Sequence, residues 1–394
     1  MELMRPARRH DGAAPTRERN NGRRLLYVVS EDWYFLSHRL PMARAARDAS
    51  FEVHVATNVK DGAREIAEEG FVLHAVPFAR GRLSLPAALA TVRALRRVHR
   101  TVAPAIVHHV ALQPTVFGLL AAIGRPVASV NAVTGLGHTF IAATAKARFL
   151  RRVIGTVLRT LINNGQSVAL VQNPDDRDLL VSLGIAKKRI VLIPGSGVDV
   201  DHLHPMPEPS DSLTVGFVGR LLEDKGIRAL IDAHRLLRTK GLNIELLIAG
   251  APDPANPASV SPEEASAWGR ELGVTWLGHV SDIATVWARA HIAVLPSRRE
   301  GLPKSLLEAA ACGRPMVATD VPGCREVAVA DKTGLLVPVD DPPALASAIE
   351  TLANSAEMRS RYGAAARQLV LEKFSSDVIG RATVDLYRRL LPAK

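Results

Sequence analysis

The chain has 394 residues and a mass of 42.4 kDa, which is more than one ordinary domain and predicts two. Hydrophobic residues make up 47% of it, so it can bury two cores, and a disordered or fibrous protein is excluded. The longest run without a charged residue, 101–124, contains two histidines and two prolines and predicts no transmembrane helix. No apolar segment follows the first arginines, which indicates a cytoplasmic protein. Residues 1–22 are polar and aperiodic and predict a mobile tail.

Short apolar runs alternate with longer amphipathic ones from Arg24 onward, which is the rhythm of strands and helices in an α/β protein. The pattern predicts a parallel sheet covered by helices on both faces, over residues 23–195. It restarts after a Gly- and Pro-rich segment and predicts a second doubly wound domain over 196–376. A last helical stretch, 377–391, has no strand left to pair with and is expected to complete the first domain. Ligands of such folds bind at the carboxyl ends of the strands, so the cleft between the domains is the expected site.

Charge is distributed unevenly between the two halves. Residues 1–195 hold 28 Lys and Arg against 14 Asp and Glu, whereas the remainder holds 22 against 25. No carboxylate lies between Glu69 and Asp175. The basic half favours an anionic partner, and a membrane surface or a phosphorylated acceptor fits better than nucleic acid, because few aromatic residues are present to stack on bases. A general compositional bias toward basic residues is the alternative.

Two familiar nucleotide-binding patterns are absent. No G-x-G-x-x-G opens the first helix and no G-x-x-x-x-G-K-[ST] occurs, so nicotinamide-dependent hydride transfer and P-loop phosphoryl transfer lose support. The segment Asp199-Val200-Asp201 matches a metal-chelating D-x-D, but it lies in the linker, where such a pair is more typical of a turn. The two cysteines, Cys312 and Cys324, have no metal-site companions and are expected to be buried thiols. We therefore predict no bound metal.

Two cations are expected at the carboxyl edge of the second sheet. A predicted strand ends in Gly219-Arg220, and Lys225-Gly226 opens the next helix. A planar guanidinium and a compact ammonium beside helix N-terminal amides suit a pyrophosphate that gains charge as it leaves. Solvated surface residues are the alternative.

Two carboxylates eight positions apart follow later in the chain. Glu300 lies in a loop before backbone amides, and Glu308 lies one to two turns into the next predicted helix. We expect Glu300 to orient sugar hydroxyls and Glu308 to hold a ribose. The alternative is that Glu300 caps the helix and that Glu308 is an exposed helical residue.

With these motifs the chain resembles retaining glycosyltransferases of the GT-B fold, in the large family 4 type that has an E-x7-E motif. The segment EGLPKSLLEAAACGRP, with the segments NAVTGLG and VQNPDDRDLL before it, most resembles the corresponding sequences of bacterial enzymes that add N-acetylated hexosamines to polyprenyl-diphosphate-linked sugars. The resemblance implies two Rossmann-like domains, a nucleoside-diphosphate sugar bound mainly by the second, and an acceptor bound by the first. It implies no cofactor, and a place at the inner face of the membrane. The implied donor-binding residues are Gly219, Arg220, Lys225, Glu300, Gly301, Leu302 and Glu308.

The candidates in the first domain are less sharply defined. His108 and His109 end a predicted strand, and because neighbouring strand residues face opposite ways, only one of them can enter the cleft. Core histidines are the alternative, and many relatives have H-x-H here instead. His38 and the glycines Gly135 and Gly137 are further candidates for contact with acceptor or phosphate, with a surface histidine and a simple turn as the alternatives.

A basic amphipathic segment at 145–162 is a candidate membrane-surface helix. Phe149, Val153, Val157 and Leu161 recur at helical spacing, and Arg148, Arg151 and Arg152 lie among them. Such a helix suits an anionic lipid surface, although its apolar face could equally pack on the sheet.

Two further functions remain open at this point. A soluble glucosyltransferase or polysaccharide synthase would share every donor residue and differ only in the acceptor. A non-catalytic protein that binds membrane or nucleic acid through its basic face would have no need of the complete donor set.

Overall fold

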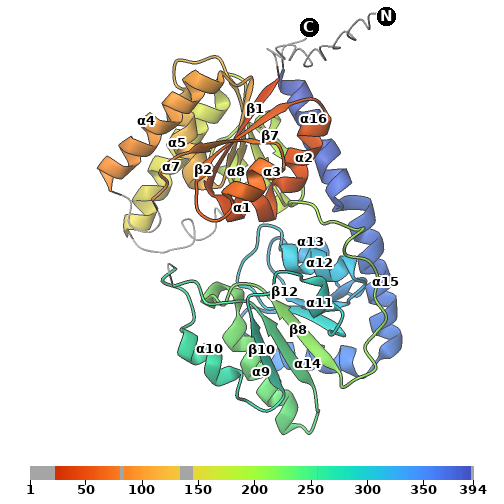
Figure 1. Cartoon of the computed structure of the whole chain (residues 1–394). Helices are drawn as coiled ribbons and strands as arrows, with labels where there is room; N and C mark the ends of the chain where they lie inside the picture. Colours follow the sequence, from red (N-terminus) through yellow and green to blue (C-terminus); the bar gives the residue numbers. More distant parts are fainter. Residues whose placement is uncertain (1–22, 80–83, 134–144, 255, 392–394) are drawn as a thin grey trace, which may run out of the picture.

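The computed structural model describes residues 23–79, 84–133, 145–254 and 256–391, and places two α/β domains one above the other (Figure 1). The predicted tail at 1–22 and the candidates Gly135 and Gly137 lie outside these residues, as do the side chains of Arg148 and Arg151. The predicted architecture of two doubly wound parallel-sheet domains is confirmed.

The first domain is built on a parallel sheet with the strand order β3-β2-β1-β4-β5-β6-β7 among the described residues. Most of its strands are buried on both faces, as expected of a sheet sandwiched between helices. The strands are β1 (Arg24–Glu31), β2 (Glu52–Asn58), β3 (Val72–Ala75), β4 (Ile106–Val110), β5 (Ala128–Ala132), β6 (Ser167–Val171) and β7 (Ile190–Leu192).

Helices cover both faces of this sheet. In several of these helices, the side chain of one N-cap residue marks the first turn. Ser84 and Asn173 accept a backbone hydrogen bond at the N-termini of α4 and α8, where proline also occupies the first turn. The helices of this domain are α1 (Asp32–His38), α2 (Leu40–Asp48), α3 (Ala63–Glu68), α4 (Leu85–Val102), α5 (Leu112–Ala122), α7 (Ala145–Asn163), α8 (Pro174–Ser182) and the 3-10 turn η1 (Lys187–Arg189).

The second domain repeats the design with the strand order β10-β9-β8-β11-β12-β13 among the described residues. Its strands are β8 (Thr214–Val218), β9 (Glu245–Ala249), β10 (Val274–Gly278), β11 (Ile292–Leu295), β12 (Met316–Thr319) and β13 (Gly334–Val337). Its helices are η2 (Glu223–Lys225), α9 (Ile227–Thr239), α10 (Pro262–Trp268), α11 (Ala284–Trp287), α12 (Lys304–Ala311), α13 (Cys324–Val327), α14 (Pro342–Ala353) and α15 (Ala356–Lys373). Cys312 and Cys324 are buried free thiols, as predicted.

The last helix, α16 (Ser376–Leu390), follows α15 and packs against α2 of the first domain (Figure 1). Its buried face contributes Ile379, Leu386 and Tyr387 to the core on that side of the first sheet. Gly380 permits the close approach, because a Cβ there would come within 2.8 Å of the Cβ of Ala45. The chain therefore crosses between the domains twice.

The buried face of α7 differs from the predicted one. Leu158 and Ile162 point into the core, whereas Val153 of the predicted apolar stripe is exposed. Arg152 is exposed as well. Leu161 of that stripe packs only partly against this core, and the centre of the buried face lies one residue further along the helix, at Leu158 and Ile162.

Candidate active site

The cleft between the domains contains a cavity of about 500 Å³. The first domain lines it with Ser30, Trp33, Tyr34, His38, Ala111 and Gln172, and the segment that joins the domains adds Ser196. The second domain lines it with Val218, Gly219, Arg220, Lys225, Glu300, Gly301, Leu302, Pro303, Lys304, Ser305 and Glu308. All seven residues that the sequence predicts for donor binding therefore meet in one cavity.

A second cavity of about 460 Å³ adjoins the first, with Trp33, Val218, Gly219 and Arg220 common to both. It extends along the second domain, past the loop that follows β9 and the loop that follows β10, and is lined by 249–254, His279, Val280 and Ile283. The two cavities together form an elongated site along the carboxyl ends of β8, β9 and β10, which is where doubly wound domains bind their ligands.

Lys225 and Glu300 form the central ion pair of the site. Nζ of Lys225 lies 2.5 Å from Oε1 of Glu300, and the hydroxyl of Ser297 donates to the same oxygen at 2.7 Å. The two side chains are only 24% and 10% exposed, so water screens the pair less than a surface pair. Gly226 makes the approach possible: its φ is +70°, and a Cβ there would lie 2.0 Å from the carbonyl oxygen of Pro296.

Arg220 lies between the two cavities and is held by a carboxylate. Its Nη1 donates to Oδ2 of Asp253 at 2.9 Å, in the loop after β9. That loop approaches closely because Gly250 lacks a Cβ, which would lie 1.8 Å from the carbonyl oxygen of Gly219. Asp253 thus fixes a guanidinium that stays about half exposed toward the cleft.

Glu308 projects from the second turn of α12 into the same cavity. Only 8% of the residue is exposed, which rules out the alternative of an ordinary surface residue. Burial raises the pKa of its carboxyl, and Lys304, whose Nζ lies 3.2 Å from Oε1, opposes that rise. A carboxylate so poorly hydrated is suited to accept hydrogen bonds from ligand hydroxyls.

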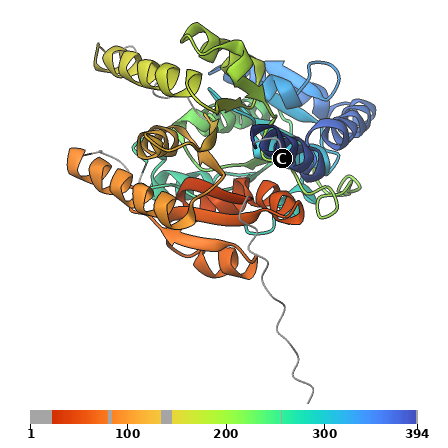
Figure 2. The same cartoon turned by 90° about the horizontal axis from the view of Figure 1, so that it is seen from above.

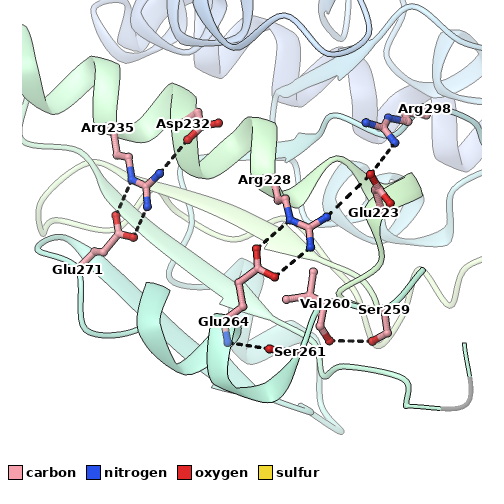
Figure 3. Close-up of polar contacts among 10 residues, drawn as sticks. All are labelled: Glu223, Arg228, Asp232, Arg235, Ser259, Val260, Ser261, Glu264, Glu271 and Arg298. Atoms are coloured by element: carbon pink, nitrogen blue, oxygen red, sulfur yellow. Dashed lines mark hydrogen bonds and ion pairs between the residues drawn. The ribbon is translucent and has the colours of Figure 1, made fainter. Parts of the chain in front are cut away.

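Ion pairs on the outer side of the second domain tie the cation-bearing turn to its surroundings (Figure 3). Glu223 at the start of η2 lies 3.4 Å from Arg298, which also binds Asp340 at 2.9 Å. Arg228 and Arg235 of α9 form bidentate ion pairs, the first with Glu264 and the second with Glu271. Each exposed pair adds little stability, but the Glu223 to Arg298 contact links the Lys225 turn to the loop of Glu300.

Three polar contacts join the two domains beside the cavity. The side-chain amide of Asn173 donates to the carbonyl oxygen of Gly301 at 2.6 Å. Arg299 binds Asp176 at 3.2 Å, and Arg325 of α13 binds Asp175 at 3.0 Å. The N-terminus of α8 in the first domain is therefore anchored to the glutamate loop of the second.

Neither His108 nor His109 enters the cleft, so this prediction is wrong. They do face opposite sides of the sheet, but helices cover both sides. Nδ1 of His108 is hydrogen-bonded to the hydroxyl of Tyr387 in α16 at 2.6 Å, and its ring stacks on Tyr27. His109 packs on Gly118 of α5, and its Nδ1 donates to Oδ1 of Asn131 at 2.8 Å. Desolvation lowers the pKa of His109 to about 3.

His38, by contrast, lies in the cavity wall opposite the second domain. Its ring stacks on Tyr34 at 4.2 Å between centroids, and Nδ1 is hydrogen-bonded to the Ser37 hydroxyl at 2.6 Å. Desolvation, with smaller effects from the cations of Arg39, Lys304, Lys225 and Arg220, lowers the pKa of His38 to about 3. The ring is therefore neutral near pH 7.

Several cleft residues escape the sequence analysis. Trp33 and Tyr34 follow directly after β1, and Gln172 follows β6. The carboxylate next to Trp33 has a structural role: Asp32 accepts hydrogen bonds from the backbone of Lys60 and Gly62. Proximity to a strand's carboxyl end is the only signal that could have identified the aromatic pair.

No group of His, Cys, Asp and Glu suited to hold a metal occurs among the described residues. Asp199 of the D-x-D segment accepts hydrogen bonds from the backbone of Asp201 and His202 and so forms a turn. Among all the residues that the structure describes, no helix combines the length and the apolarity needed to span a bilayer.

Comparison with known sequences identifies both domains. Residues 24–164 match the family described as "Glycosyl transferase 4-like", and residues 212–355 match "Glycosyl transferases group 1". The chain is 25% identical over 379 residues to the N,N'-diacetylbacillosaminyl-diphospho-undecaprenol alpha-1,3-N-acetylgalactosaminyltransferase of Campylobacter jejuni, covering 91% of this chain and 98% of that protein.

Two further curated relatives match over shorter stretches. Identity to the alpha-maltose-1-phosphate synthase of Mycolicibacterium smegmatis is 31% over 266 residues, covering 61% of this chain and 67% of that protein. Identity to the capsular polysaccharide biosynthesis glycosyltransferase CapM of Staphylococcus aureus is 32%, but the match spans only 46% of this chain and 47% of that protein.

Solved structures agree in fold. Sucrose-phosphate synthase of Thermosynechococcus elongatus superimposes with a TM-score of 0.79 at 20% identity, covering 93% of this chain and 99% of that one. HepE of Anabaena, in complex with UDP and glucose, gives a TM-score of 0.75 at 17% identity, covering 92% and 99%. With a cleft that gathers the predicted donor residues and with both domains matched, the chain belongs to the group 1 glycosyltransferases of the GT-B fold.

Proposed function

We propose that the chain transfers a sugar from a UDP-sugar to a polyprenyl-diphosphate-linked glycan, with retention of anomeric configuration and without a metal. The sugar is an N-acetylated hexosamine. The observation that carries this proposal is the convergence of Arg220, Lys225, Glu300 and Glu308 on one elongated cavity.

The donor fits along the two adjoining cavities. The nucleoside lies toward the loops after β9 and β10, and Glu308 accepts hydrogen bonds from its ribose. The diphosphate lies between Arg220 and Lys225, near the N-terminus of α12, where the first backbone N–H groups have no partner within the helix. The sugar then lies beside Glu300 and the backbone of Gly301 and Leu302, facing the first domain. The UDP and glucose bound to HepE support this class of donor.

The chemistry follows from that placement. The bond between the anomeric carbon and the diphosphate oxygen breaks, and both electrons leave with UDP, whose growing charge Arg220 and Lys225 stabilise. The acceptor hydroxyl attacks from the face that UDP has just left, and its proton passes to the departing phosphate. Glu300, held by Lys225 and Ser297, orients the sugar hydroxyls during this exchange.

The acceptor approaches from the first domain. His38 is neutral and half-buried in that wall, so it can accept or donate one hydrogen bond without adding charge. The lipid-linked diphosphate named for the Campylobacter relative supports an anionic lipid acceptor, and the basic first domain suits one. With such an acceptor the protein would act in the cytoplasm at the inner face of the membrane. The proposal includes no cofactor and no nucleic acid as a partner.

A thermal-shift panel of UDP-, GDP-, dTDP- and ADP-sugars tests the donor assignment, because a ligand bound only by the native state raises the melting temperature. We expect UDP-sugars to stabilise the wild type, and Glu308→Gln, which keeps the shape of the side chain, to lose most of that shift. Arg270→Gln, an exposed change on the second domain, is the matched control. Equal shifts with all four nucleotides, or an unchanged shift in Glu308→Gln, would contradict the assignment.

A soluble glucosyltransferase or polysaccharide synthase is the second candidate. The 31% identity to the alpha-maltose-1-phosphate synthase favours it, because that name describes a different kind of product. Radiolabelled UDP-sugar, offered with either a polyprenyl-diphosphate sugar or a maltooligosaccharide, distinguishes the two by which acceptor becomes labelled. A non-catalytic binding protein is disfavoured by the complete donor set.

A further inference from the structure

The outward face of α4 carries four exposed arginines. Arg93, Arg96, Arg97 and Arg100 recur at helical spacing and are all exposed, while Leu95, Val98 and Val102 on the opposite face pack into the core. Arg125, in the loop between α5 and β5, joins them, and together with Ile123 and Gly124 the five arginines line a single depression. We call these five arginines the α4 basic surface.

No acidic side chain neutralises this surface. Within the part of the chain that the structure describes, none of the five arginines takes part in an ion pair. The segment that forms the surface and its surroundings, from residue 70 to residue 174, contains no Asp or Glu. Five guanidinium groups without counter-charges create a local positive potential that favours a polyanionic partner.

Apolar side chains flank the arginines on the same side of the molecule. Leu85 and Leu89, two turns and one turn before Arg93, are 81% and 52% exposed, and Ile123 is 54% exposed. Exposed leucines on the same helix face as basic residues are the side chains that enter the headgroup region of a bilayer. Exposed aromatic side chains, which would stack on nucleic-acid bases, are absent from α4 and the Ile123 loop.

The direction of α4 relates this surface to the cleft. The helix follows β3, so it begins at the carboxyl edge of the sheet, which faces the cleft, and it ends at the far edge beside Arg125. Its 18 residues extend for about 27 Å. Figures 1 and 2 place α4 on the outside of the first domain, on the same side as α7. A flat surface laid along α4 therefore reaches from Arg125 to the edge of the active-site cleft.

We propose that the α4 basic surface docks the protein on an anionic lipid leaflet, with Leu85, Leu89 and Ile123 inserted among the headgroups. The inference deepens the proposed function and rests on it for one point only, namely that a lipid-linked acceptor would then emerge beside the cleft. The docking itself depends on charge and exposed apolar area, not on catalysis. This surface is distinct from the one that the sequence predicts in α7, whose side chains at 145–151 lie outside the described residues.

Vesicle flotation with the full chain tests the proposal. The probes are vesicles of phosphatidylcholine alone and vesicles containing about one third phosphatidylglycerol, at about 0.1 M and about 0.5 M salt. We expect binding only to the anionic vesicles, weakened at high salt. Arg96→Glu with Arg97→Glu should lower the affinity at least tenfold, since each basic residue near such a surface contributes about 1 kcal/mol. Arg270→Glu with Arg289→Glu changes the net charge equally on the exposed surface of the second domain and should bind as the wild type does.

A second pair, Leu85→Ser with Leu89→Ser, should remove the binding that persists at high salt. UDP-induced thermal shifts keep the two proposals apart: the α4 variants should retain them, whereas a failed donor assignment would abolish them in the wild type as well. Wild-type binding to neutral vesicles alone, unchanged binding in both α4 pairs, or loss of binding only in Arg152→Glu of α7 would overturn the proposal. Tighter binding to single-stranded DNA than to anionic vesicles would also overturn it.

Discussion

The side-chain amide of Asn173 in the first domain donates a hydrogen bond of 2.6 Å to the backbone carbonyl of Gly301 in the second. The same side chain caps α8, because its Oδ1 accepts from the backbone N–H of Asp176 at 2.8 Å. Gly301 follows Glu300 directly. The position of the Glu300 loop in one domain is therefore coupled to a helix terminus in the other.

Replacing Asn173 by serine should separate these two roles. Serine keeps the helix cap but cannot reach and donate to Gly301, so the melting temperature should stay close to that of the wild type. Loss of one neutral hydrogen bond should lower kcat by roughly three- to tenfold, with a smaller change in KM for the UDP-sugar. UDP release under saturating donor is the measurement. Arg325→Ala, which removes the exposed pair with Asp175 across the same interface, is the control and should leave kcat unchanged.

Lys225→Ala and Glu300→Ala should each reduce turnover by roughly a hundredfold or more, because each removes charge stabilisation or orientation in the transition state. The double variant should be little worse than either single one, since each single change already leaves its partner in the cleft unpaired. Single-turnover rates with a common donor measure the coupling. Near-normal rates in either single variant, with folding verified by circular dichroism, would refute the assigned roles.

Activity should survive treatment with EDTA. In the proposed reaction, Arg220 and Lys225 stabilise the diphosphate. The Asp199 carboxylate of the D-x-D segment accepts hydrogen bonds from backbone N–H groups. UDP release should therefore be equal before and after dialysis against the chelator. A loss of activity that manganese restores, and that Asp199→Ala abolishes for good, would assign the metal role to that segment instead.

Folding stability should fall as the pH drops below about 6.5. Desolvation lowers the pKa of His99 to about 4 and those of His38 and His109 to about 3, whereas the unfolded chain protonates these rings near 6.5. The unfolded state thus binds more protons throughout that window, and each ring costs up to about 1.4 kcal/mol of unfolding free energy per pH unit.

Urea denaturation at a series of pH values between neutrality and the lower pKa values measures this effect. His99→Gln should lower the slope of the unfolding free energy against pH by the amount that corresponds to about one bound proton. His204→Asn, at an exposed position, should leave it as in the wild type. A urea midpoint that stays constant on acidification would contradict the expectation.

The fold could be predicted largely because both sheets are parallel and buried on both faces. Runs such as LLYVVS and IELLIAG are apolar throughout, and the glycines and prolines between runs mark where helices begin and end. The apolar pattern does not predict the helix α5, because Leu112–Ala122 is nearly as apolar as a strand and has little amphipathic contrast. The donor side of the site could be predicted because its motifs are local, within the turn after β8 and the start of α12.

Apart from His38, the cleft residues of the first domain could not be predicted, because they meet only through long-range packing. The environment of His108 depends on Tyr387, some 280 positions away. The sequence predicts that the last helix returns to the first domain, but it does not indicate which face of the sheet that helix covers. Asn173 reads as an ordinary helix cap, and only the approach of the second domain supplies its other partner. In α7, the direction of Val153 depends on which residues of the helix pack on β6 and α8, and these are Leu158 and Ile162.

The return of α16 to the first domain has a consequence for synthesis. Tyr387 bonds both Tyr27 and His108 and fills the core beside β1, so the earliest-made domain lacks part of its interior until the last one is complete. During translation, the apolar surface of α2 and the adjoining strands stays exposed until about 180 further residues have left the ribosome and α16 can cover it. A nascent chain stalled before residue 376 should therefore be captured by chaperones and cut by proteases in its N-terminal half, even though that half is already fully polymerised.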